Sequence, residues 1–113
     1  MERLRQRADF LAAAAGTKAP TAAFILQARA RDDAAPARIG FTVSKKVGNA
    51  VERNRVRRRL RAVVRGSAAL NAANGHDYVV IGRRTALTTP FERLVADFAG
   101  ALRRVHGKRR HPG

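Results

Sequence analysis

Residues 38–65 read RIGFTVSKKVGNAVERNRVRRRLRAVVR, and this stretch decides the fold. Apolar residues alternate with polar or small ones from Arg38 to Ser44, which predicts a half-buried strand. Asn49 then precedes a helical pattern, and Glu52 stands three residues after it, as in a capping box. The stretch therefore predicts a strand that passes through a short basic turn into a capped helix.

The helix predicted from Asn49 to about Arg65 has one apolar face and one basic face. Its apolar residues recur at helical spacing: Val56, Leu60, Val63 and Val64. Seven arginines and no acid lie between positions 53 and 65: Arg53, Arg55, Arg57, Arg58, Arg59, Arg61 and Arg65. Like charges at helical spacing destabilise a helix by roughly 0.2–0.5 kcal/mol per pair. Because this repulsion is uncorrected, and because guanidinium groups bind phosphate oxygens in pairs, the pattern favours a nucleic-acid backbone as partner. An arginine-rich helix that is merely solvated is the alternative.

The remaining segments predict one sheet with helices packed against it, an α+β (α/β sandwich) fold of about four strands and three helices. Further strands are expected at 24–28 and at 78–81, the latter apolar on both faces as in a central strand. The polar connection at 32–36 predicts a hairpin loop between the strands at 24–28 and 38–44.

Two further helices are expected, one near each end of the chain. The first covers residues 4–15. The last is capped by Thr89, with Pro90 in its first position and Glu92 completing a capping box. Its predicted buried stripe comprises Phe91, Leu94, Val95, Phe98, Leu102 and Val105. The whole chain, 1–113, is thus predicted to be a single domain, with a basic, mobile tail from about residue 107.

Charge is the outstanding feature of the composition. The 113 residues include 24 Lys and Arg but only 8 Asp and Glu, which gives a formal net charge of +16. Such a chain needs a polyanion, and nucleic acid is favoured over an acidic protein or a membrane surface. The absence of cysteine excludes disulfides, thiol nucleophiles and cysteine-ligated metals. No apolar run approaches the ~20 residues of a membrane span, and the first residues lack a secretory pattern, so a cytoplasmic protein is expected.

Two places besides the arginine-rich helix are candidates for binding RNA. Lys45 and Lys46 lie at the end of a strand, just before Gly48 and a helix N-terminus, which predicts an anion-binding corner. An ordinary polar turn is the alternative. The second place is the sheet face opposite the apolar one, where polar and basic residues edged by an aromatic could hold an extended RNA strand. By strand alternation this face carries Arg38, Gly40, Thr42 and Ser44 beside Ile25, Gln27 and Arg29, and Phe10 stands at its edge. A solvent-facing sheet surface, with Phe10 in the core, is the alternative there.

No catalytic residue and no metal site are predicted in this chain. The acids are scattered, whereas two-metal phosphodiester hydrolysis needs converging carboxylates. His76, His106 and His111 lie far apart in sequence, so a histidine acid–base pair is only a weak alternative. If the protein takes part in RNA cleavage, the reacting groups and metal ions are expected on its partner.

Residues 40–61, GFTVSKKVGNAVERNRVRRRLR, resemble the signature of the bacterial ribonuclease P protein component. The Arg-Asn-Arg motif of that family is intact as Arg53, Asn54 and Arg55. Supporting matches are Arg3-Leu4, Asp9-Phe10 and the segment from Asp77 to Arg83, so the resemblance extends over nearly the whole chain.

The resemblance implies a small accessory subunit paired with a catalytic RNA. Together they remove the 5′ leader of precursor tRNA by hydrolysis that depends on Mg²⁺, which is bound mainly by the RNA. The expected partners are therefore the catalytic ribonuclease P RNA and precursor tRNA, with no DNA and no membrane. The implied fold resembles the second domain of a small-subunit ribosomal protein, with a left-handed βαβ crossover through the arginine-rich helix, whereas the general rule favours a right-handed one.

Site residues follow from the resemblance and from the patterns above. The residues expected to contact the catalytic RNA are Lys45, Lys46, Arg53, Asn54, Arg55, Arg57, Arg58, Arg61 and Arg65. The leader is expected on Phe10, Ile25, Gln27, Arg38, Thr42 and Ser44. Ala14 and Gln27 stand where the family often has aromatic residues, so leader binding is expected to depend more on charge and to be more sensitive to salt.

Two other functions fit the composition. A structural ribosomal protein or RNA chaperone would be equally basic, and only the arginine motif in its strand–helix context argues against it. A DNA-binding module is weaker, because the sequence has no helix-turn-helix spacing and no evident dimer face.

Overall fold

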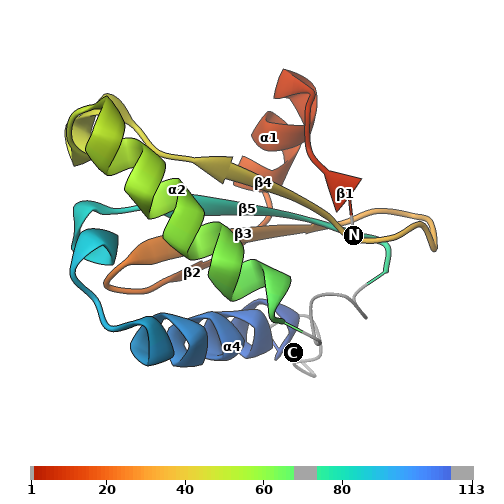
Figure 1. The fold of residues 1–113 in the computed structure, drawn as a ribbon. Helices are drawn as coiled ribbons and strands as arrows, with labels where there is room; N and C mark the ends of the chain where they lie inside the picture. Colours follow the sequence, from red (N-terminus) through yellow and green to blue (C-terminus); the bar gives the residue numbers. More distant parts are fainter. Residues whose placement is uncertain (1, 68–73, 108–113) are drawn as a thin grey trace.

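The structure, a computed structural model, describes residues 2–67 and 74–107 and is built around one mixed sheet (Figure 1). The sheet has five strands in the order β1-β4-β5-β3-β2. In chain order the elements are β1 (Glu2–Arg3), α1 (Arg7–Ala14), β2 (Thr17–Pro20), β3 (Phe24–Ala30), β4 (Arg38–Thr42), the short 3-10 helix η1 (Lys45–Val47), α2 (Ala50–Arg65), β5 (His76–Gly82), the 3-10 helix η2 (Arg84–Leu87) and α4 (Phe91–Gly107). The α+β arrangement predicted from the sequence is confirmed.

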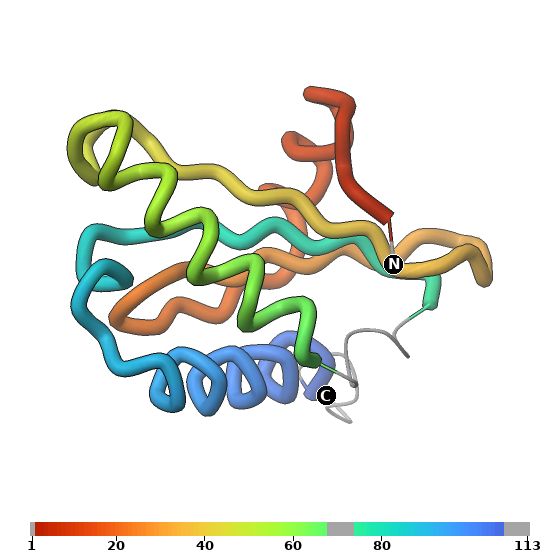
Figure 2. The backbone as a smooth tube through the Cα atoms, in the orientation of Figure 1, coloured from red at the N-terminus to blue at the C-terminus, as the bar shows by residue number. Residues whose placement is uncertain are grey.

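The helices divide unequally between the two faces of the sheet. Helices α2 and α4 cover one face and α1 lies against the other (Figure 2). The main core lies under α2 and α4 and includes Phe24, Leu26, Ile39, Val43, Val56, Leu60, Tyr78, Val80, Leu94 and Phe98. A smaller cluster under α1 consists of Leu4, Ala13 and Val79, with Phe10 and Ile81 packed against it. The face that carries only α1 therefore leaves sheet residues beside that helix exposed to solvent.

The connection between β4 and β5 is left-handed. These two strands are parallel neighbours, and α2 lies between them in the chain. In Figure 1 both strands run from right to left, α2 lies in front of them, and β5 lies below β4. The handedness agrees with the family resemblance and departs from the general preference for right-handed crossovers.

The cap predicted for α2 is present. The Asn49 side chain accepts a hydrogen bond from the Glu52 backbone N–H at 2.9 Å, and the Asn49 N–H donates to Glu52 Oε1 at 3.0 Å. Val56, Leu60, Val63 and Val64 are all buried, as their spacing predicts. The helix therefore presents the opposite, arginine-bearing surface to solvent.

The predicted hairpin between the strands at 24–28 and 38–44 is wrong. Strand β5 lies between β3 and β4, pairing antiparallel with β3 and parallel with β4. The reason is burial: β5 is apolar on both faces, and the central position covers it from both sides. The observed hairpin joins β2 to β3, with the Thr21 N–H donating to the Phe24 carbonyl at 2.7 Å.

The two end helices differ in detail from the prediction. Residues 2–3 form the edge strand β1 instead of leading into a helix at residue 4, and α1 begins at Arg7. The Thr89 hydroxyl donates to the Thr85 carbonyl at 2.7 Å, and α4 begins at Phe91. Phe91 and Val95 of the predicted buried stripe are each 43% exposed, because the core contact rests on Leu94 and the residues that follow it at helical spacing.

The tail predicted beyond residue 107 lies outside the described residues. Within residues 2–67 and 74–107, no helix combines the length and the hydropathy needed to span a lipid bilayer.

Candidate nucleic-acid interface

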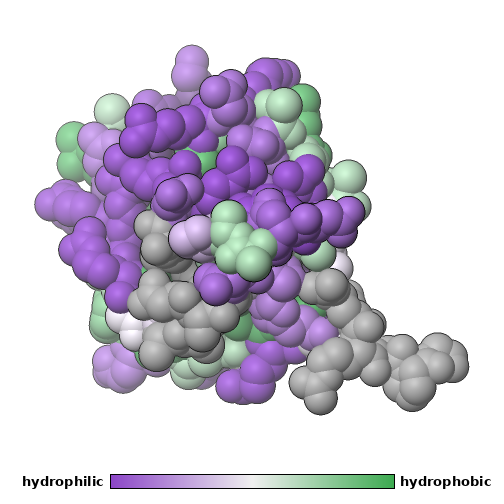
Figure 3. Space-filling model, turned by 90° about the vertical axis from the view of Figure 1, so that its right-hand side faces the viewer, coloured by the Kyte–Doolittle hydropathy of each residue, from purple (hydrophilic) through white to green (hydrophobic). Residues whose placement is uncertain are grey.

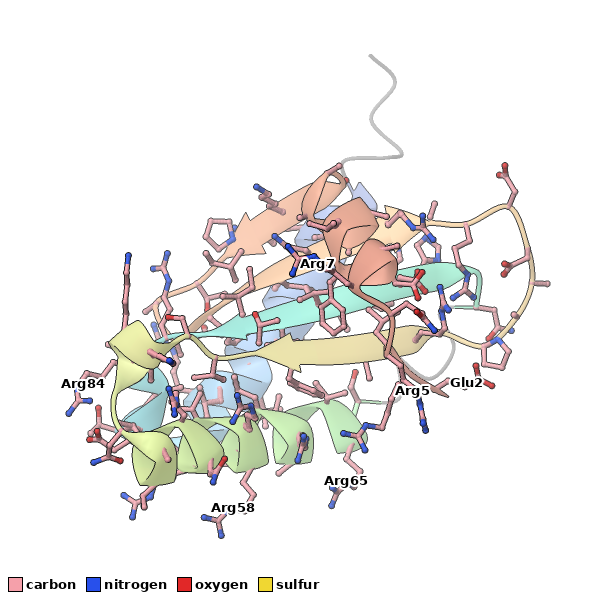
Figure 4. The ribbon with its side chains drawn as sticks, turned by 90° about the horizontal axis from the view of Figure 1, so that it is seen from above. Glu2, Arg5, Arg7, Arg58, Arg65 and Arg84 are labelled. Carbon is pink, nitrogen blue, oxygen red and sulfur yellow. The ribbon has the colours of Figure 1, made fainter. Side chains whose placement is uncertain are left out.

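Six arginines form a continuous basic surface on α2, which we call the arginine ridge: Arg53, Arg55, Arg57, Arg58, Arg61 and Arg65. Arg55, Arg58 and Arg65 are exposed, and the other three are partly exposed. None of the six forms an ion pair with an acid in the described ranges 2–67 and 74–107. Figure 4 shows Arg58 and Arg65 projecting from α2 on the side away from the sheet. The ridge is therefore free to bind an anion.

Arg59 is the exception among the seven arginines of α2. Its Nη1 donates to the Ala86 carbonyl, and its Nη2 donates to the Thr89 carbonyl at 2.6 Å. It thereby ties α2 to η2 and to the segment that leads into α4. Its role is structural, and its position in the sequence offered no sign of this.

Replacing Arg59 with Ala should destabilise the fold without weakening RNA binding. Two carbonyls lose a charged donor, and such hydrogen bonds are each worth roughly 1.5–3 kcal/mol, so we expect a loss of about 3 kcal/mol in the free energy of unfolding. Urea unfolding measures this loss. The neighbouring change Arg58→Ala is the matched control, because Arg58 is exposed and has no such partner. The assignment fails if both variants are equally stable.

The corner before α2 is held by a residue from a distant part of the chain. Arg84 donates to the Val47 carbonyl at 2.7 Å and to Glu52 Oε2 at 3.0 Å. The hydrogen bond from Arg84, and the one from the Asn49 N–H, lower the pKa of the Glu52 carboxyl. Lys45 and Lys46 are exposed in η1, directly before the capped end of the helix. The structure therefore places both lysines beside the start of the arginine ridge, at the end of the molecule where Figure 4 shows Arg84.

The candidate residues for the second RNA site lie on the α1 side of the sheet. Strand register places Ile25 of β3 and Thr42 of β4 on either side of Ile81. Gln27 likewise faces Gly40 across Val79. The ring of Phe10 lies over Gly40, where a Cβ would stand only 2.5 Å from two ring carbons. Phe10, Ile25, Gln27 and Thr42 are thus brought to one face, whereas Ser44 lies beyond the strand end.

Burial separates these residues further. Thr42 is exposed, Phe10 and Ile25 are partly exposed, and Gln27 is only 7% exposed. Ala14 lies one helical turn after Phe10 in α1 and is partly exposed. The open surface on this face is therefore mostly small and polar, with Phe10 as its aromatic edge.

Arg38, a candidate for the same site, is engaged by acids. Its Nη2 and Nε donate to the two carboxylate oxygens of Asp77 at 2.7 and 2.8 Å, and Nη2 also contacts Asp9 at 3.3 Å. Arg29 and Arg31 bind the same Asp77 carboxylate, which is fully buried. We call these four residues the Asp77 cluster: Asp77, Arg29, Arg31 and Arg38. It lies at the end of the sheet where β4 and β5 begin, under the largely hydrophilic face shown in Figure 3.

The Asp77 cluster is an ionised network. Burial of Asp77 opposes its ionisation, but the hydrogen bonds and positive charges of Arg38 and Arg31 outweigh burial and hold its pKa below the usual value. The hydrogen bond to Asp77 raises the pKa of Arg38 in turn. Sequence patterns did not indicate this network, because Asp77 lies 39 to 48 residues along the chain from the three arginines that bind it.

The structure brings together two histidines that are far apart in sequence. The rings of His76 and His106 lie 4.8 Å apart, and the Tyr78 hydroxyl lies 2.6 Å from His106 Nε2. His111 lies outside the described residues. No group of three or more potential metal ligands occurs among the side chains of residues 2–67 and 74–107.

Comparison of the chain with known proteins assigns it to a family. The family model named "Ribonuclease P" matches residues 1–106. The chain belongs to the ribonuclease P protein family. It is 52% identical over 104 residues to the ribonuclease P protein component of Gluconacetobacter diazotrophicus, with 91% of this chain and 90% of that protein covered. It is 48% identical over 110 residues to that of Paramagnetospirillum magneticum, with 93% and 83% covered. The resemblance inferred from residues 40–61 is confirmed.

Solved ribonuclease P proteins share the fold. The protein from Thermotoga maritima superposes with a TM-score of 0.76 at 28% identity, covering 93% of this chain and 98% of that one. The protein from Staphylococcus aureus gives a TM-score of 0.75 at 25% identity, covering 91% and 94%. The five-stranded mixed sheet and the three α-helices of the described residues thus have the fold of bacterial ribonuclease P proteins.

Proposed function

We propose that this chain is the protein subunit of a ribonuclease P ribonucleoprotein and that it binds the catalytic RNA through the arginine ridge. The observation that carries the proposal is that six guanidinium groups stand on one helix and none forms an ion pair in the described residues. A folded RNA supplies the dense phosphates that relieve their mutual repulsion. Lys45, Lys46 and Asn54 extend the same surface toward the corner before α2.

The face beside α1 is proposed to bind the single-stranded 5′ leader of precursor tRNA. Phe10 offers a ring edge, and Ile25 and Thr42 lie on either side of β5. Gln27 stands where the family resemblance leads us to expect an aromatic residue. Since base stacking on aromatic side chains is worth roughly 1–3 kcal/mol per base, its reduction here leaves a larger share of the affinity to charge. Arg38 acts on this site mainly by fixing the strand, since Asp77 and Asp9 engage its guanidinium.

In this proposal the hydrolysis that releases the leader and leaves the mature 5′ end of the tRNA takes place on the RNA. Mg²⁺ is bound mainly by that RNA, and this chain supplies binding and orientation. Its contribution is to neutralise phosphate repulsion between the catalytic RNA and its substrate, which lowers the Mg²⁺ concentration that cleavage needs. The protein is accordingly an accessory subunit of a tRNA-processing ribonuclease.

The test is the identity of the RNA that the chain holds in its own cells. Affinity purification of the tagged chain from a lysate in moderate salt, followed by RNA sequencing, should enrich the catalytic RNA of ribonuclease P and precursor tRNAs. The alternative, a ribosomal protein or RNA chaperone, predicts ribosomal RNA or a broad RNA population instead. A variant with Arg53→Ala and Arg55→Ala, purified in parallel, should lose the catalytic RNA selectively.

A further inference from the structure

A depression at the edge of the arginine ridge shares Arg61 and Arg65 with it, but the apolar residues that form its floor are assigned to neither RNA site. It lies between the edge of the sheet at β1–β4 and the last turns of α2, and its volume is about 290 Å³. It is lined by Arg3, Ile39, Phe41, Arg61, Val64 and Arg65. Phe41 points to the α2 side of its strand, so the depression lies on the opposite side of the sheet from Phe10 and the proposed leader site.

The floor of the depression is apolar, and the guanidinium group of Arg61 lies over an aromatic ring in it. Ile39 and Val64 are buried, and Phe41 is partly buried beside them. The Arg61 guanidinium carbon lies over the Phe41 ring, 5.8 Å from its centroid. A guanidinium that rests on an aromatic ring keeps its other planar face for a second flat group.

The rim is positive. Arg3 and Arg65 are both exposed, and neither forms an ion pair in the part of the chain that the structure describes. In Figure 4 Arg65 stands at the same end of the molecule as Glu2 and Arg5, opposite Arg84. No acid lines the depression, so three guanidinium groups surround an apolar floor. This combination suits a ligand that is flat and apolar in one part and anionic in another.

We propose that this depression takes one unpaired nucleobase of the RNA bound along α2. The base stacks on the face of the Arg61 guanidinium that is turned away from Phe41, and Arg3 and Arg65 hold the phosphates on either side. Single-stranded bases are recognised in this way on guanidinium planes and aromatic rings, whereas a base-paired helix offers side chains only its backbone and groove edges. The inference rests on the proposed function. It adds a contact with a nucleobase to the arginine ridge, which is otherwise proposed to bind phosphates.

The test compares variants that keep charge but lose planarity. Arg61→Lys retains the positive charge and removes the stacking plane, and Phe41→Leu removes the ring beneath it. Because stacking of one base is worth roughly 1–3 kcal/mol, each variant should bind the catalytic ribonuclease P RNA about tenfold more weakly. The slope of log affinity against log salt concentration should stay unchanged, since no phosphate contact is lost.

Two controls match these changes. Arg58→Lys makes the same exchange at an exposed ridge position with no aromatic ring beneath it, and should weaken binding less than threefold. Phe91→Leu removes an exposed ring from α4 and should leave binding unchanged. The melting temperature of each variant shows whether weaker binding comes from the altered depression or from an unfolded protein. If Arg61→Lys and Phe41→Leu bind like the wild type, the nucleobase site is refuted while the proposed function stands. If the wild type itself does not bind that RNA, the proposed function fails first.

Discussion

Replacing both Arg53 and Arg55 with Ala should weaken binding of the catalytic RNA by about a hundredfold. Each guanidinium is proposed to make a charged contact with phosphate, and such contacts are individually worth roughly 1.5 kcal/mol or more. Neither side chain forms an ion pair in the described residues, so removing it costs the free protein little. The dissociation constant should be measured by filter binding or fluorescence anisotropy across a series of salt concentrations.

The dependence of affinity on salt concentration shows whether the double variant has lost phosphate contacts or has lost its fold. Each phosphate contact contributes roughly 0.7–0.9 to the slope of log affinity against log salt, so the double variant should have a slope shallower by about 1.5. A second double variant, Arg93→Ala with Arg103→Ala, removes the same charge from exposed positions on α4. If it weakens binding as much as the α2 variant, binding depends on net charge alone and the ridge has no special role.

The change Asp77→Asn should produce the largest loss of stability. The Asp77 carboxylate is fully buried and holds Arg29, Arg31 and Arg38. Breaking a buried ion pair from one side typically costs roughly 3–5 kcal/mol, because the remaining charges are left without compensation. For a domain of this size that corresponds to a fall of at least about 10 °C in the melting temperature. Differential scanning calorimetry measures it.

The exposed Asp32 provides the matched control, since Asp32→Asn makes the same chemical change in the connection between β3 and β4. Its melting temperature should stay within about 2 °C of the wild type, as expected for an exposed site. An Asp77→Asn protein as stable as this control would contradict the cluster's structural role.

The pH dependence of stability follows from the same carboxylate. The pKa of Asp77 is lower in the folded protein than the usual value of about 3.9 in the unfolded chain. Its contribution is therefore fully present above that unfolded value and is lost as the pH falls through the folded one. Between pH 5 and pH 3 the wild type should lose stability more steeply than Asp77→Asn. Parallel slopes for the two proteins would contradict this assignment.

Local signals in the sequence predicted the centre of the fold well. The alternation from Arg38 to Ser44 and the capping pair of Asn49 and Glu52 act over a few residues, so they appear directly in the sequence and are present in the structure. The order in which the strands pair was harder to predict from the sequence. Polar residues at 32–36 look like a hairpin loop, yet β5, which comes 40 or so residues later, lies between the two strands. Burial of a two-sided apolar strand, a non-local effect, decided the sheet order.

In the candidate site, too, local features were predicted and long-range contacts were not. Helical spacing alone was enough to place the arginine ridge, because one face of α2 is fixed by its buried valines and leucine. Spacing did not reveal that Arg59 binds backbone carbonyls, that Arg84 holds the corner before α2, or that Asp77 occupies Arg38. Each of these contacts joins residues 27 or more positions apart, and only the folded chain brings them together.

Reconstituted cleavage of precursor tRNA tests the central claim most directly. The purified chain, the catalytic RNA of the same genome, and the two combined would each be incubated with precursor tRNA at low Mg²⁺ concentration. We expect the mature 5′ end to form efficiently only in the combined reaction, with no cleavage by the chain alone. Cleavage by the chain without RNA, or a combined rate no higher than that of the RNA alone, would contradict the account.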